Sequence, residues 1–203
     1  MTTKHFLTNG IELYNHLGFS IENPDDRLHG KVVGLLFCGD FSDSQLQSFV
    51  HHLRPFFNRV NGCDPATKEY TGKRGHVLDI VVVPGAGADD GKVREFLQKD
   101  TCPPFLHVSP EHGGGVYKRE EFGFEGGGDQ LGLIIVNYDG SVISPTGIVD
   151  ILSSGDSCLM GWQMKRKNEP VGDGGGEREE VEFKGGAKGS RKVVGGVVLD
   201  LPF

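Results

Sequence analysis

The chain lacks several features that would assign it to a common functional class. Its 203 residues include only four cysteines, which lie far apart and form no Cys-x-x-Cys pair. A disulfide-rich scaffold and a zinc ribbon are therefore excluded, because both need closely spaced cysteines. No apolar run approaches the roughly 18 residues of a membrane-spanning helix, and residues 1–7 lack the apolar stretch of a secretory signal. We expect a reduced, cytoplasmic chain without a membrane anchor.

Positive charge is also scarce. The chain has 21 lysines and arginines against 28 acidic residues, for a net charge of −7. This excludes a protein that binds nucleic acid through bulk electrostatics, since neutralising phosphates requires a basic surface. The apolar fraction of 36% is low because 32 residues are glycine, far above the usual share of about 7%. Most of these glycines follow residue 110, so we expect expanded loops and a flexible tail there.

Apolar patterns predict the elements of a mixed α/β domain. Three continuous apolar runs of strand length predict strands buried on both faces: Val32–Cys38, Val77–Val83 and Leu131–Tyr138. Asp139-Gly140 and the returning residues 141–144 predict a terminal hairpin. A short helix is expected over residues 93–100, and an extended segment over residues 102–108, where two prolines exclude helix.

The clearest helix is predicted over residues 42–60, where apolar side chains recur at spacings of three and four. Ser42 with Gln45 three residues later fits a capping box at its start. Pro55 is expected to kink or shorten this helix, because proline removes a backbone hydrogen bond.

Smaller features complete the order of elements. Residues 6–17 indicate a short strand or a helical turn, and residues 23–26 have the composition of a turn. One helical turn is expected over residues 117–122, and a helix or a loop over residues 147–159.

The composition changes after Trp162, where charged and glycine-rich segments begin. We predict a domain over residues 1–162 and a Gly-rich charged tail over residues 163–203. The tail ends in an apolar segment, residues 193–203. This segment either adds a strand to the sheet edge of a partner or packs on its own domain, and the residues alone favour neither alternative.

Residues Gly30–Gln45 resemble the segment that opens tryparedoxin and nucleoredoxin domains. In those domains a Gly-Lys pair and an apolar strand lead into Trp-Cys-x-x-Cys at a helix start. Further similar segments are found at residues 77–83, 92–99, 102–110 and 133–143. The resemblance covers roughly residues 5–162, and it implies an α/β thioredoxin-like fold with a mixed central sheet flanked by helices.

The chemical positions of that family are replaced. The resemblance places the tryptophan on Phe41, the nucleophilic cysteine on Ser42, the resolving cysteine on Gln45, and the cis-proline on or near Leu131. Disulfide exchange needs a thiolate to attack and a second thiol to release the product, and neither Ser42 nor Gln45 can supply one.

The resemblance therefore implies a non-catalytic thioredoxin-like protein of a eukaryote. Such a protein is expected to act as an interaction or structural component of a protein assembly. It would contact protein partners through the former active-site face and the C-terminal tail. Attachment to a larger assembly, such as a cilium or flagellum, stays open.

An atypical thiol oxidoreductase is the alternative, with Cys38 or Cys102 as its nucleophile. Cys38 ends an apolar strand, which favours an inert buried side chain. Cys102 precedes two prolines and is expected in an exposed loop, without a basic neighbour in sequence that would lower its pKa. Cys63 and Cys158 are also expected in loops.

Binding of a nucleotide, cofactor or metal is disfavoured. Residues 84–93 imitate a phosphate-binding loop before Lys92, but Ala86 stands where its first glycine is required, and two aspartates would repel phosphate. The histidines at positions 51, 52, 107 and 112 show no metal-ligand spacing. We therefore predict no cofactor and no metal.

Overall fold

The computed structural model describes residues 12–71, 76–85, 87–109, 131–137 and 140–166, and the backbone at 193–194 and 197–198. The chain divides into two units, Met1–Glu169 and Pro170–Phe203. The elements of the first unit, in chain order, are β1 (Leu13–Tyr14), α1 (Pro24–Leu28), β2 (Val32–Cys38), α2 (Ser44–Asn61), β3 (Leu78–Pro84), α3 (Asp90–Gln98), β4 (Leu106–Val108), β5 (Gly132–Val136), β6 (Val142–Ser144), α5 (Gly147–Ser154) and α6 (Ser157–Lys165).

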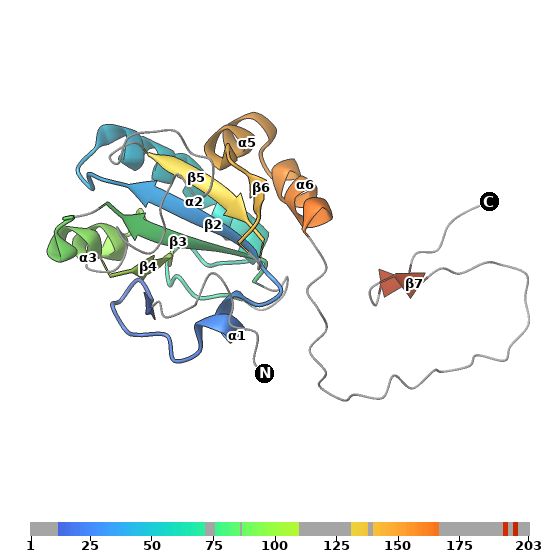
Figure 1. The fold of residues 1–203 in the computed structure, drawn as a ribbon, viewed down its shortest axis with the longest axis horizontal. Helices are drawn as coiled ribbons and strands as arrows, with labels where there is room; N and C mark the ends of the chain where they lie inside the picture. Colours follow the sequence, from blue (N-terminus) through green and yellow to red (C-terminus); the bar gives the residue numbers. More distant parts are fainter. Residues whose placement is uncertain are drawn as a thin grey trace, which may run out of the picture. The chain divides into compact units, whose positions relative to one another are not determined.

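These strands form one mixed sheet of six, in the order β1-β4-β3-β2-β5-β6 (Figure 1). β2, β3 and β4 run parallel to one another, and α2 and α3 make the two crossovers between them. β5 is antiparallel to β2, and β6 is antiparallel to β5. The predicted mixed sheet and its terminal hairpin are therefore confirmed.

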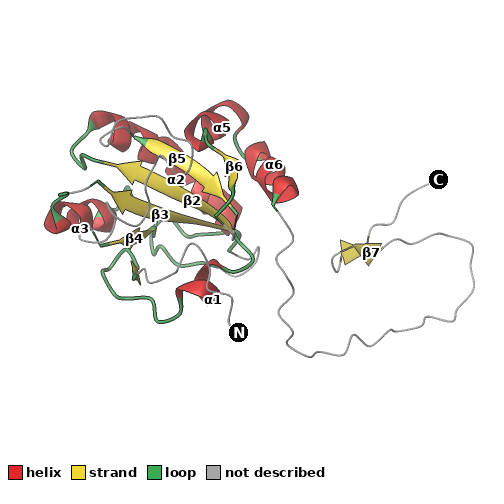
Figure 2. Cartoon of the chain, in the orientation of Figure 1, coloured by secondary structure: helices red, strands yellow, loops and turns green. Residues whose placement is uncertain are grey.

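The central strands are buried on both faces, as their continuous apolar runs predict. Alternate residues face opposite layers, so Leu36 packs with the helices while Leu35 packs with Leu28 of α1. The helix-side core joins α2, α3, α5 and α6 to the sheet. Figure 2 shows α5 and α6 beside the β6 end of the sheet.

Helix α2 has the predicted amphipathic pattern, but its course through Pro55 and its N-cap differ from the predictions. Its apolar stripe is buried, with Leu53 and Phe57 fully enclosed. The helix continues through Pro55 and ends at Gly62, whose φ of 60° suits glycine. The helix is not shortened at Pro55, because the buried side chains before and after it hold the helix on the sheet, and a kink there stays a prediction.

Two segments are helical where the sequence predicted a turn, or left a helix and a loop as alternatives. Residues 23–26, predicted as a turn, begin helix α1, and Pro24 occupies its first turn, where the missing N–H costs no hydrogen bond. Residues 147–159 contain α5 and the start of α6 rather than a loop. The helical turn expected over residues 117–122 lies outside the described residues.

The second unit contains two short strands, β7 (Val193–Val194) and β8 (Val197–Val198), which pair antiparallel with each other. The role of the tail and the domain boundary near residue 163 stay predictions. In the described part of the chain, no helix is long and apolar enough to cross a membrane.

A pair of glycine substitutions tests the packing of the sheet. A Cβ added at Gly34 would lie 2.6 Å from the Cδ1 of Ile80 and 3.0 Å from the Cδ1 of Leu133. We expect Gly34→Ala to lower the free energy of unfolding by about 1–3 kcal/mol through overpacking. Urea denaturation measures this change.

Gly161→Ala is the matched control. An added Cβ at Gly161 in α6 meets nothing within 4 Å, and alanine favours helix by about 1 kcal/mol over glycine. This variant should be at least as stable as the wild type. Equal urea midpoints for Gly34→Ala and the wild type would contradict the packing described.

Candidate functional site

β2 and β3 end side by side at one edge of the sheet. Cys38 is paired with Pro84 at their carboxyl ends, and the Gly85 N–H donates to the Cys38 carbonyl at 2.9 Å. Helices α2 and α3 begin a few residues beyond these ends. Because consecutive parallel strands deliver their following loops to the same edge, this is the edge where a site is expected.

The structure gathers at this edge the four residues that the resemblance places at redox positions. Phe41, Ser42 and Gln45 occupy the loop after β2 and the first turn of α2. β5 pairs Phe37 with Gly132, so the antiparallel register brings Leu131 opposite Cys38. Leu131 is half-buried against the core, and the described residues contain no cis peptide bond. What these positions do in the protein stays a prediction.

The start of α2 corrects the predicted capping box. The N-cap is Asp43, whose carboxylate accepts from the Gln45 N–H at 2.8 Å. The Ser42 N–H and Oγ both donate to the Asp40 carboxylate, at 2.8 and 2.6 Å. The prediction that Ser42 caps the helix is wrong because a carboxylate is the stronger acceptor and complements the positive end of the helix dipole.

Negative charge occupies both helix starts at this edge. The two hydrogen bonds from Ser42 lower the pKa of the exposed Asp40 carboxyl, and the charge of Lys92 lowers it further. Asp89 caps α3 by accepting from the Lys92 N–H at 2.9 Å. A thiolate or a phosphate at either helix start would therefore meet a carboxylate already in place.

Phe41, where the resemblance places the tryptophan, is a core side chain. It is 5% exposed and packs edge to face on Phe96 of α3, with ring centroids 5.4 Å apart. The Gln47 amide donates to the Phe41 carbonyl at 2.9 Å. The aromatic ring thus ties α2 to α3 and is not presented to solvent.

All four cysteines are buried. Cys38 and Cys102 are only 2% and 1% exposed, so the expectation of an exposed Cys102 is wrong: its segment packs into the helix-side core. Burial raises the pKa of the Cys102 thiol to about 12 and that of Cys158 to about 11. Cys158 lies in α6 rather than in a loop, and burial also raises the pKa of Cys63.

Solved structures with a similar fold include thioredoxins and tryparedoxins. A thioredoxin from Wuchereria bancrofti is 20% identical, over 76% of this chain and 94% of its own, with a TM-score of 0.53. A cysteine-to-alanine mutant of tryparedoxin-I is 20% identical, over 74% of this chain and 91% of its own, with a TM-score of 0.54. Tryparedoxin II from C. fasciculata is 14% identical, over 75% and 88%, with a TM-score of 0.55. This chain has a thioredoxin-like fold. No protein-family model and no curated protein matches it.

The opposite edge of the thioredoxin-like sheet holds a buried ionic cluster that the sequence interpretation missed. Asp79, at the start of β3, is 1% exposed. Its carboxylate lies 3.2 Å from Arg27 Nη2, 3.0 Å from Lys31 Nζ and 2.8 Å from His76 Nε2. Burial alone would raise the pKa of Asp79, but the hydrogen bond from His76 and the neighbouring positive charges outweigh it and lower the pKa. The sequence signal that could have revealed this cluster is the single aspartate, Asp79, inside an otherwise apolar strand.

No metal centre is formed in the described part of the chain, where no three histidine, cysteine or acidic side chains converge. His107 is enclosed in β4, and burial lowers its pKa to about 4. His51 and His52 follow each other on α2, with ring centroids 5.9 Å apart.

Two alanine substitutions test the assignment of the cap. Asp43→Ala removes the carboxylate that holds the first turn of α2 and should cost about 1 kcal/mol of stability. Ser42→Ala removes only an exposed hydroxyl and should change stability by less than about 0.5 kcal/mol. Thermal and urea unfolding measure both. The reverse order of effects would restore Ser42 as the cap.

Proposed function

We propose that this thioredoxin-like protein does not catalyse dithiol–disulfide exchange and instead binds protein partners as an interaction or structural component of an assembly. One observation carries the proposal: the exposed start of α2 presents Ser42 and Gln45, where exchange chemistry needs two thiols. The carboxylate of Asp43 also compensates the partial positive charge at the start of α2, which would otherwise stabilise a thiolate.

The burial of the remaining thiols argues against an atypical thiol oxidoreductase. A protein disulfide must reach the attacking sulfur, and Cys38 and Cys102 lie inside the core. For Cys102, the raised pKa also removes the thiolate at neutral pH.

The contact surface that we propose is the former active-site face, defined here by the exposed residues Asp40, Ser42, Ser44 and Gln45. It is polar, and its backbone is held by the Asp40 and Asp43 hydrogen bonds and by the buried ring of Phe41. A rigid polar surface of this kind loses little conformational entropy on binding. The tail is a second proposed contact, and the proposed setting is the cytoplasm.

The absence of exchange chemistry is tested with an insulin-disulfide reduction assay. The wild-type protein should not raise the rate above that of the dithiol reductant alone. The double variant Ser42→Cys, Gln45→Cys is the control for access. Its two new thiols should react with a thiol reagent in the folded protein, while the four native cysteines react only in urea. Turnover by the wild type that is lost in Cys38→Ser or Cys102→Ser would establish the thiol enzyme instead.

The contact surface is tested by capture of partners from an extract of the source organism. Gln45→Arg should lose proteins that the wild type retains, because the larger charged side chain obstructs the former active-site face. Gln163→Arg, an equal change at an exposed glutamine of α6, should retain them. Identical capture by all three proteins, or loss with Gln163→Arg alone, would place the contact elsewhere.

A further inference from the structure

A pocket of about 260 Å³ lies away from the former active-site face. Its walls come from the segment after β1, from α1, from the loop after α2, and from the start of β4. Arg27 in this wall contacts Asp79, which stands at the amino end of β3. Because β2 and β3 are parallel, the pocket and the start of α2 lie at opposite edges of the sheet.

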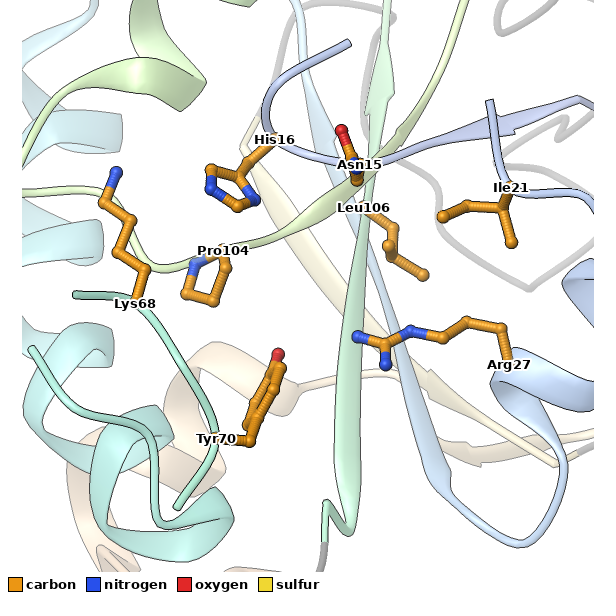
Figure 3. A pocket seen from close by; sticks show the side chains of 8 residues that line it. All are labelled: Asn15, His16, Ile21, Arg27, Lys68, Tyr70, Pro104 and Leu106. Carbon is orange, nitrogen blue, oxygen red and sulfur yellow. The ribbon is translucent and has the colours of Figure 1, made fainter. Parts of the chain in front are cut away.

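The pocket is lined by positive charge. Arg27 and Lys68 are both part of its wall, and none of the described residues that line it is acidic. Figure 3 shows Arg27 reaching across from α1 toward the ring of Tyr70, with Lys68 on the other side of the space. His16 adds a ring whose pKa is lowered by burial and by the charge of Lys68, so it is neutral at pH 7.

The Arg27 Nε and the Tyr70 hydroxyl are buried in this wall without a well-formed hydrogen bond, although the Arg27 guanidinium is close enough to interact with Tyr70. The remaining contacts of these side chains are fixed: Arg27 Nη2 is held by Asp79 at 3.2 Å, and the Tyr70 ring stacks on His76 at 4.1 Å. Burial raises the pKa of Tyr70, so its hydroxyl keeps its proton. Buried donors are costly when they are left unpaired.

Lys68 supplies an independent observation. Its φ of 59° is the single positive value at a non-glycine residue in the described part of the chain. Glycine would adopt this conformation without steric cost, whereas lysine is strained. The position is held by the Lys68 N–H on the Asp64 carbonyl and by its Nζ on the Lys99 carbonyl, both at 2.9 Å. Strain of this kind collects at ligand sites.

We propose that this pocket binds a small organic anion, a carboxylate or a phosphate monoester, whose charged oxygens face Arg27 and Lys68. The apolar body of the ligand lies against Ile21, Pro104 and Leu106, which complete the wall. The volume is near the lower end for small-molecule sites, so the body is about one ring in size. This site does not depend on the proposed partner binding.

The proposal is tested by NMR titration of the full chain with benzoate, phenyl phosphate and benzamide. Benzoate or phenyl phosphate should shift the amide signals of residues around the pocket, and the stronger of the two identifies the anionic group. Benzamide, which has the shape of benzoate without its charge, should not.

Lys68→Gly separates a binding role from a structural one. Glycine relieves the backbone strain, so the melting temperature should stay the same or rise, while anion binding weakens about tenfold. Lys92→Gln, at an exposed lysine of α3 outside the pocket, is the matched control and should leave binding unchanged. The absence of any shift with both anions, or equal affinity in Lys68→Gly and the wild type, would overturn the proposal.

Discussion

Seven residue pairs join β2 to β3 in parallel, from Val32 with Leu78 to Cys38 with Pro84. Both strands are buried on both faces, so their backbone hydrogen bonds are shielded and their register cannot slip without exposing apolar side chains. This register brings the starts of α2 and α3 together at one edge. At the other edge it places Asp79 where Arg27 and Lys31 can reach it.

At the edge where α2 and α3 begin, carboxylates occupy both helix starts. Asp43 and Asp89 place carboxylates where the free N–H groups of the helices would otherwise attract a thiolate. Phe41 is turned into the core against Phe96. These features favour the stability of the fold over the availability of a reactive group, and in our proposal this surface binds partners.

At the opposite edge, charged groups are buried instead of exposed, since Asp79 lies in the interior. Arg27 links the buried ion cluster to the pocket, since its Nη2 contacts Asp79 and the residue forms part of the pocket wall beside Tyr70. Breaking a buried ion pair leaves an uncompensated charge, which is costly. The contact with Asp79 therefore holds the Arg27 side chain in one orientation. A site built on such a residue is preorganised, which lowers the entropy lost on binding.

Much of the fold could be predicted from local pattern. The apolar run at residues 32–38 and the helical stripe of α2 predicted their elements, because burial on both faces and burial on one face leave different periodicities. The cap was predicted one residue too early, since Ser42 and Asp43 both suit a helix start. Only the structure shows that the Ser42 hydroxyl donates a hydrogen bond to the Asp40 carboxylate. The exposure of Cys102 was predicted wrongly because prolines indicate an extended backbone but not where it packs.

The sequence by itself determined the order of the elements from β2 to β6 and the absence of thiols at positions 42 and 45, since both depend on local residue types. Only the tertiary structure decided that every cysteine is buried and that Asp79 contacts Arg27, Lys31 and His76. It also decided that Arg27, Lys68 and Tyr70 share one pocket. Those residues come from segments separated along the chain, and no local pattern records which of them meet, because pairing across a sheet is a property of the whole fold.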